Sequence, residues 1–411
     1  MYLINHVVAT TVTLILVDLT TLSECRPNNI CRNFIDYSSI QTNPNCWYNP
    51  DLGATAEQIA TRYGFPFEEH EVTTGDGYII TLFRIPHNGS DVHRKRPVVF
   101  LQHGIAADGY TWMVAGRNSS VFIFSNQGYD VWISNCRGTE PSSKHVKYTP
   151  YDREFWLYSF HEMALYDIPA MLDFVAAKTQ QQISYVGHSM GCTMALIYTS
   201  LMPQQAQTNL KSIVALAPVA FMDHVTSAVK LIVPFRYIIW EVLSSAGIYG
   251  VGPQLKNLQR LSHLCGSYPF IKVCVLTNAL LSGINTMEAS ASAFPIGIRH
   301  FPIGLSMKTI FHYAQIMDTR RRFQFFDYGP ELNWRLYNSS LPPEYPIGNV
   351  RIPMHLFYGN RDTLSAEKDV HYLYEQLRTN KTIKEVFNFA HLDFLGATHS
   401  ADLYYMLLDY L

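Results

Sequence analysis

Residues 187–191 read Gly-His-Ser-Met-Gly, after a short apolar run at residues 183–186 and before a helical pattern at residues 192–201. A G-x-S-x-G sequence between a strand and a helix is typical of a nucleophile elbow, a sharp turn that lifts the serine hydroxyl above a sheet. The two glycines leave steric room for the turn, and the Met190 N–H at the helix start can stabilise an oxyanion. The alternative is an ordinary glycine-rich turn, but the context favours Ser189 as a nucleophile.

A serine hydroxyl is a poor nucleophile near neutral pH and needs a base that is oriented by an acid. In a turn of this kind the partners follow in the chain order Ser, Asp or Glu, His. Asp362 and His391 each follow an apolar run that reads as a strand, which predicts that both lie on the same sheet edge as Ser189. These three residues form the predicted catalytic triad. Asp393 is the rival acid, but its closeness to His391 suggests that it shapes the histidine loop.

A second oxyanion donor is expected from the loop after the apolar run at residues 97–101. That loop reads Gln-His-Gly-Ile-Ala over residues 102–106, and the Ile105 N–H is the predicted donor. The alternative is an ordinary strand-to-helix turn.

The elements that must position these residues are short apolar or β-rich runs separated by helical patterns. Such runs are what a parallel sheet requires, and with an N-terminal hairpin around residues 74–77 they predict eight strands. The runs cover residues 68–72, 78–84, 97–101, 129–133, 183–186, 210–216, 352–358 and 383–389, and one helix is expected over residues 155–178. The fold class is therefore α/β, with a mostly parallel sheet.

The alternation breaks at residues 221–345, where the sequence is helical and irregular and rich in Phe, Leu and Ile. An insertion between two strands lies over their carboxyl ends, where open α/β sheets bind ligands. It therefore predicts a helical cap between core segments 49–220 and 346–411. Six apolar cap residues either line an acyl-chain site or form the core of the insertion: Phe235, Ile238, Ile239, Trp240, Phe270 and Ile271.

The first 23 residues are mostly apolar and end in small residues, which favours a secretory signal peptide over a membrane anchor. No other membrane span is expected. A cysteine-containing extension follows at residues 24–48, in which one pair of Cys25, Cys31 and Cys46 could form a bridge. Cys136 and Cys192 are expected to be buried thiols. Four N-x-S/T sequons, at Asn88, Asn118, Asn338 and Asn380, are candidate glycosylation sites.

Composition limits the ligands. Hydrophobic residues make up 48% and charged residues 16% of the 411-residue chain, and the formal net charge is −2. A chain without a basic stripe is a poor nucleic-acid binder. Its apolar excess leaves surface for a lipid or an interface. No cluster with zinc-like spacing occurs, so neither a metal nor a cofactor is expected.

Together these motifs resemble the acid lipases, the family that includes lysosomal acid lipase and gastric lipase, from about Asn49 to the C-terminus. Beyond the elbow, the matching sequences are Tyr63-Gly-Phe-Pro66, Thr74-x-Asp76-Gly-Tyr78, His103-Gly104, Asn135-x-Arg137-Gly138, His161-Glu162-Met163 with Tyr166-Asp167 and Pro169, and His391-Leu-Asp-Phe394. The chain departs from the family pattern at Met190, Cys192, Thr139 with Glu140-Pro141, and at Arg361 and Thr363 around the acid. None of these departures removes a reacting group.

The resemblance implies an α/β-hydrolase fold whose triad falls on Ser189, Asp362 and His391. It also implies a helical cap with a movable lid at about residues 251–281, and a bridge between Cys265 and Cys274. The implied activity is serine-type hydrolysis of neutral lipid esters, triacylglycerols or sterol esters, by a secreted or lysosomal enzyme at a lipid–water interface. No obligate protein partner is expected. The alternatives are a catalytically weak lipid-binding or storage protein on the same scaffold, and other α/β-hydrolase chemistry; an epoxide hydrolase needs Asp in place of Ser189.

Overall fold

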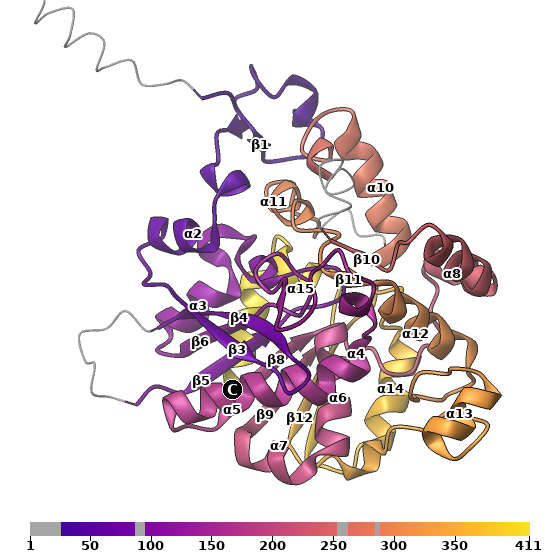
Figure 1. Cartoon of the computed structure of the whole chain (residues 1–411). Coiled ribbons are helices and arrows are strands. Elements are labelled where there is room, and N and C mark those ends of the chain that lie inside the picture. Colours follow the sequence, from indigo (N-terminus) through magenta and orange to yellow (C-terminus); the bar gives the residue numbers. More distant parts are fainter. Residues whose placement is uncertain (1–25, 87–94, 253–261, 284–287) are drawn as a thin grey trace, which may run out of the picture.

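The computed structural model describes residues 26–86, 95–252, 262–283 and 288–411 (Figure 1). Within these residues the centre is a nine-stranded sheet in the order β13-β12-β9-β8-β5-β6-β4-β3, with β7 paired to β4. The strands are β3 (Glu68–Thr73), β4 (Tyr78–Ile85), β5 (Val98–Gln102), β6 (Asp130–Ser134), β7 (Lys144–His145), β8 (Ile183–His188), β9 (Leu210–Leu216), β12 (Met354–Gly359) and β13 (Lys381–Val386). All eight predicted strands are present. The ninth, β7, is only two residues long and was not predicted.

The six strands from β13 to β6 run parallel, whereas β3, β4 and β7 are antiparallel to their neighbours. Every residue of β5, β6 and β8 is buried, as expected for strands covered on both faces. β13 has no fully buried residue because it is the edge strand. The prediction of a buried strand at residues 383–389 therefore placed this strand slightly too far toward the C-terminus. It was also wrong about the burial of the strand.

Helices cover both faces of the sheet, and the alternation of side chains along the strands divides the core into two apolar clusters. Phe100 and Tyr185 pack in one cluster with α5 (Ile168–Thr179) and α6 (Met190–Leu201). Leu101 and its neighbours pack in the other cluster with α3 (Ser120–Asn126) and α16 (Ser400–Leu407). The sheet is thus held rigidly between two helical layers, which fixes the ends of its strands.

The helix expected over residues 155–178 begins later than predicted. Ser159 forms a capping box with Glu162, so helix α4 starts at Phe160. It runs through a π-helical turn at Met163–Asp167 into α5. The remaining core helices are α2 (Ala56–Arg62), α7 (Pro203–Asn209), α14 (Glu367–Gln376) and α15 (Asp393–Gly396).

The segment between β9 and β12 forms the cap above one end of the sheet (Figure 1). Its elements are the 3-10 helix η7 (Ala228–Phe235), α8 (Arg236–Ser245), β10 (Gly250–Val251), α10 (Phe270–Ser282), α11 (Phe294–Ile298), β11 (Leu305–Ser306), α12 (Met307–Asp318) and α13 (Pro330–Tyr337). Most of the six cap residues singled out from sequence do not form its core. Phe235, Ile238 and Phe270 are exposed, and only Ile271 is fully buried among the six.

The N-terminal extension packs on the cap. Strands β1 (Ile30–Cys31) and β2 (Cys46–Trp47) pair, and a disulfide joins Cys31 to Cys46. This settles the bridge that the sequence left open; Cys25 lies outside the described residues. The extension contacts Ile271 of α10, and β1 lies near the upper end of α10 in Figure 1. In the part of the chain that the structure describes, no helix is long and apolar enough to cross a membrane.

Candidate active site

Ser189 lies on a strained turn between β8 and α6. Its backbone has φ +54° and ψ −114°, a conformation that costs energy for a residue with a side chain and is typical of functional turns. The flanking glycines are sterically required. A Cβ at Gly191 would lie 2.5 Å from the Gln102 carbonyl oxygen, and one at Gly187 would lie 2.9 Å from the Gly191 carbonyl carbon. The sequence therefore places Ser189 above the end of β8, as an elbow requires.

The structure brings the three predicted triad residues into one hydrogen-bonded chain. Asp362 Oδ2 lies 2.7 Å from His391 Nδ1, and His391 Nε2 lies 2.7 Å from Ser189 Oγ. Because a carboxylate only accepts, His391 carries its proton on Nδ1 and Nε2 accepts from the serine hydroxyl. All three residues are buried, and the Asp362 carboxylate is fully withdrawn from solvent. This arrangement can transfer a proton from Ser189 to His391 while Asp362 holds the imidazole.

The two carboxylates near His391 have different partners. The second oxygen of Asp362, Oδ1, accepts the backbone N–H groups of Leu364 and Ser365, both at 2.8 Å. Asp393 instead accepts the Ala390 N–H through Oδ2 at 2.7 Å. Asp362 is therefore the carboxylate aimed at the imidazole, and Asp393 shapes the turn that carries His391.

The two predicted oxyanion donors belong to segments that adjoin Ser189. A Cβ at Gly104 would lie 3.2 Å from Ser189 Cβ, so the loop that carries Ile105 passes directly beside the nucleophile. Met190 is the first residue of α6, and an N–H in the first turn has no carbonyl partner within its own helix. The Ile105 and Met190 amides therefore remain the predicted oxyanion donors, on a loop and a helix start that both adjoin Ser189.

Two buried histidines support this geometry, and the sequence analysis assigned a role to neither. His188 Nε2–H donates to the His391 carbonyl at 2.8 Å, and burial lowers the His188 pKa to about 3. His103 Nδ1–H donates to the Gly104 carbonyl at 2.8 Å, and its Nε2 accepts the Cys136 N–H at 2.9 Å. Burial also lowers the His103 pKa. The His188 ring therefore stays neutral in mild acid, and His103 Nε2 needs its lone pair to accept the Cys136 N–H. Both rings hold the loops of the site.

The two predicted free thiols are buried, and both make hydrogen bonds near the site. Cys192 Sγ–H donates to the Gly187 carbonyl at 3.1 Å, so this departure from the family keeps a donor behind the elbow. Cys136 Sγ accepts from Gln102 Nε2 at 3.0 Å. Burial raises the pKa of each thiol far above its usual value, which makes both poor nucleophiles.

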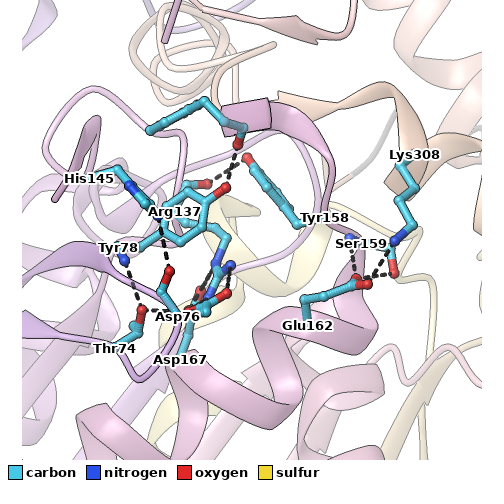
Figure 2. A network of polar contacts seen from close by, with 11 residues as sticks. Thr74, Asp76, Tyr78, Arg137, His145, Tyr158, Ser159, Glu162, Asp167 and Lys308 are labelled. Carbon is cyan, nitrogen blue, oxygen red and sulfur yellow. Dashed lines mark hydrogen bonds and ion pairs between the residues drawn. The ribbon is translucent and has the colours of Figure 1, made fainter. Parts of the chain in front are cut away.

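Several family-typical residues meet in one buried ionic network (Figure 2). Arg137 donates to Asp76 at 2.6 and 2.9 Å and to both carboxylate oxygens of Asp167, and its guanidinium lies 3.8 Å from the centre of the Tyr78 ring. Burial works against the charge of Arg137, but the two carboxylates outweigh it and raise its pKa. Tyr158 Oη–H donates to the Arg137 carbonyl at 2.9 Å. The signal in the sequence was Arg137 itself, which follows an apolar strand closely. An arginine that is buried at such a position needs charged or polar partners.

A second ionic group in Figure 2 joins the core to the cap. Glu162 accepts the Ser159 N–H at 2.7 Å and the Ser159 hydroxyl at 2.9 Å, and Lys308 Nζ of α12 donates to it at 2.7 Å. Burial opposes ionisation of Glu162, but Lys308, His161 and the hydrogen bonds lower its pKa to about 2. Glu162 is therefore charged throughout the acid range in which proteins usually work.

The predicted bridge between Cys265 and Cys274 is present. Of the four sequons, Asn118, Asn338 and Asn380 are exposed, and Asn88 lies outside the described residues. Among the described residues, no group of three or more His, Cys, Asp or Glu side chains is placed to hold a metal ion.

Comparisons with known proteins concern the family and the fold of the chain. The family described as the partial alpha/beta-hydrolase lipase region matches residues 56–116, and the alpha/beta hydrolase fold family matches residues 97–241. An alpha/beta hydrolase fold protein from Nakamurella multipartita has a TM-score of 0.51 at 12% identity, covering 84% of this chain and 99% of its own. This likeness concerns the fold alone.

Two relatives have a much higher sequence identity to this chain. The chain is 35% identical over 362 residues to gastric triacylglycerol lipase of Rattus norvegicus, covering 85% of this chain and 89% of that protein. It is 36% identical over 354 residues to lysosomal acid lipase/cholesteryl ester hydrolase of Homo sapiens, covering 84% of this chain and 88% of that protein. Both matches extend over the core and the cap.

Proposed function

Because the chain belongs to the acid lipase family of α/β-hydrolases, we propose that it hydrolyses the carboxylic ester bonds of neutral lipids, triacylglycerols or sterol esters. The observation that carries this proposal is the continuous hydrogen-bonded chain from Asp362 through His391 to Ser189. A lipid-binding or storage protein has no need of a strained, buried serine held against a histidine. This geometry therefore favours an ester-hydrolysing enzyme over a lipid-storage protein.

The proposed reaction follows from the proton positions. Ser189 Oγ attacks the ester carbonyl carbon while its proton passes to His391 Nε2, and the Ile105 and Met190 N–H groups stabilise the oxyanion. His391 then gives that proton to the departing alcohol oxygen, leaving an acyl-serine. A water molecule, deprotonated by His391, attacks the acyl carbon, and the proton returns to Ser189 as the fatty acid leaves. Asp362 remains ionised and orients the imidazole throughout.

The cap offers a surface for the lipid–water interface. α8 has no buried residue, and α10 buries only Ile271 and Ser282. A soluble helix normally hides its apolar side chains against a core. Exposed apolar residues of η7, α8 and α10 are Leu231, Ile232, Phe235, Tyr237, Ile238, Ile239, Val242, Phe270, Val273, Leu276 and Leu280. We take a neutral lipid surface as their partner, since the same cap covers the strand ends that hold Ser189.

The lid proposed for residues 251–281 falls partly on residues 253–261, which lie outside the described part. Its described remainder contains the Cys265–Cys274 bridge and most of α10. The signal peptide proposed for residues 1–23 also lies outside the described residues. Two disulfides and three exposed sequons suit a secreted or lysosomal protein, and they support the proposal that the chain enters the secretory pathway.

The test is direct hydrolysis with a nucleophile control. Purified protein is assayed on triolein, cholesteryl oleate and p-nitrophenyl butyrate from pH 4 to 8, beside Ser189→Ala. We expect wild-type activity on at least one long-chain ester, a loss of about 10⁴-fold or more in the variant, and covalent labelling of wild type alone by a serine-directed organophosphonate. Lipid binding by wild type without turnover or labelling would instead identify a storage protein.

A further inference from the structure

The C-terminal end of cap helix α10 contacts both loops that complete the triad. The last carbonyls of a helix have no partner within it, and here they are taken by groups next to the acid and the base. The Leu281 carbonyl accepts Ser227 Oγ–H at 2.6 Å and Thr363 Oγ1–H at 3.2 Å. The Ser282 carbonyl accepts the backbone N–H of His391 at 3.0 Å. One helix end is therefore bonded directly to the triad histidine and to the residue after the triad aspartate.

The acid loop is also tied to the start of the cap. The Thr363 carbonyl accepts the backbone N–H groups of Thr226 at 3.0 Å and Ser227 at 3.1 Å. Ser227 then extends its hydroxyl to Leu281, so three separate segments meet at Thr363. Thr363 is one of the positions at which the chain departs from the family pattern. Its hydroxyl group makes a hydrogen bond to α10, which is a structural role for this departure.

Close backbone packing reinforces the contact. Gly283 follows α10 with φ +109°, and a Cβ there would lie 2.1 Å from the Arg361 carbonyl oxygen and 3.2 Å from Ala390 Cβ. Arg361 precedes Asp362 and Ala390 precedes His391 in the chain. The residue after the helix is thus pressed between the two loops, where a side chain has no room.

We propose that the C-terminal end of α10 is a positioning clamp for the triad, with Thr363 and Ser227 as its side-chain positioning residues. The clamp holds the loop that carries Asp362 and the loop that carries His391 in a fixed position relative to each other. It also links them to the helix whose exposed residues Phe270, Val273, Leu276 and Leu280 face the proposed lipid surface. This inference rests on the proposed ester hydrolysis. A displacement of a catalytic group by about 1 Å can cost about 10²-fold in rate, so a clamp of this kind acts on turnover.

The test uses Thr363→Val, which removes the hydroxyl and keeps the shape, beside Thr363→Ser, which keeps a hydroxyl. The substrate is soluble p-nitrophenyl butyrate, so lipid adsorption plays no part. We expect Thr363→Val to lower kcat by about 10-fold with KM within about 2-fold, and Thr363→Ser to stay near wild type. Adding Ser227→Ala to Thr363→Val should deepen the loss in kcat toward about 10²-fold, because Leu281 then loses both hydroxyl donors.

The matched control is Thr379→Val, because Thr379 Oγ1 donates to the Arg351 carbonyl at 3.1 Å on the exposed surface. It should keep wild-type kcat, and thermal unfolding should show every variant folded at the assay temperature. A Thr363→Val enzyme with wild-type kcat would overturn the clamp, and so would an equal loss in Thr363→Ser or in Thr379→Val. Wild type and Ser189→Ala run in the same assay. An inactive wild type refutes the proposed function, whereas an active wild type with an unaffected Thr363→Val refutes only the clamp.

Discussion

At the scale of single residues, the site is defined by which atoms face one another rather than by residue type. Asp362 and Asp393 are both carboxylates within reach of the histidine loop, yet only Asp362 meets the imidazole. Chain order and strand position favour Asp362 from sequence, and the structure places its carboxylate against the imidazole. The neutral histidines His188 and His103 were not found this way, because their roles depend on contacts with backbone carbonyls and N–H groups that no spacing rule specifies.

We expect Asp362→Asn to lower kcat by about 10⁴-fold with little loss of stability. The amide keeps the shape of the loop but presents an NH₂ group either to the imidazole or to the two N–H donors, so His391 loses its orientation and the charge that stabilises its protonated form. Steady-state hydrolysis of p-nitrophenyl butyrate measures the effect.

The control is Asp393→Asn, whose side-chain oxygen can still accept the Ala390 N–H, so we expect a loss within about 10-fold, of the size of one weakened hydrogen bond. If Asp393→Asn lost most of its kcat while Asp362→Asn kept a kcat near that of wild type, Asp393 and not Asp362 would be the catalytic acid.

At the scale of elements, strands were easier to predict than the cap. Buried parallel strands such as β5 and β8 are continuous apolar runs bounded by turns, and the sequence located them well. The edge strand β13 was placed late because its residues are half-buried or exposed and do not form a continuous apolar run. The cap was recognised as an insertion, but its apolar residues were not sorted into core and surface. Helical periodicity shows which residues share a face, and only the fold shows whether anything covers that face.

The link between α4 and α12 predicts a pH-dependent stability. The Glu162 pKa of about 2 in the folded protein is below the ordinary glutamate value of 4.5. Its contribution is therefore complete above about pH 4.5 and is lost as the pH falls through about 2. We expect Glu162→Gln to destabilise the protein by about 2 kcal/mol at pH 5–7, and the gap from wild type to close between pH 4.5 and 2.

Chemical denaturation of both proteins across this pH range measures the gap. The comparison variant is Glu344→Gln, which breaks the exposed ion pair with Arg322 and should change stability by less than about 1 kcal/mol. A gap for Glu162→Gln that stays constant down to pH 2 would show that its carboxylate charge contributes nothing to folding.

At the scale of the whole molecule, the chain consists of a rigid sheet, a cap over its catalytic edge and an extension packed on the cap (Figure 1). The core buries its apolar residues on both faces of the sheet, while α8 and α10 leave theirs exposed. The low charged fraction indicated apolar surface from composition alone. Its location on two cap helices needed the structure.

The exposed face of α8 predicts a selective loss on lipid particles. Ile238 and Val242 lie one turn apart with 64% and 62% of their surface exposed, so Ile238→Glu with Val242→Glu should leave folding intact. Full burial of each side chain in lipid contributes roughly 1.5–3 kcal/mol. We expect at least about a 10-fold loss on emulsified triolein, and p-nitrophenyl butyrate hydrolysis within about 2-fold of wild type, both from rate measurements.

The matched control places the same charges on α13, with Leu332→Glu and Leu336→Glu, also exposed and one turn apart. This pair should leave triolein hydrolysis unchanged. An equal loss from both helices would mean that added negative charge, and not the α8 face, weakens contact with the emulsion.

The placement of the cysteines has a consequence for oxidative folding. The bridges Cys31–Cys46 and Cys265–Cys274 span only 15 and 9 residues, so each can close by a short-range search before the sheet assembles. Cys136 and Cys192 instead become less reactive as the protein folds, because packing of the core buries both thiols and raises their pKa. Since thiolates carry out thiol–disulfide exchange, completion of the sheet withdraws these two sulfurs from exchange. Assembly of the catalytic core thereby protects both bridges from reshuffling by these two thiols in an oxidising compartment.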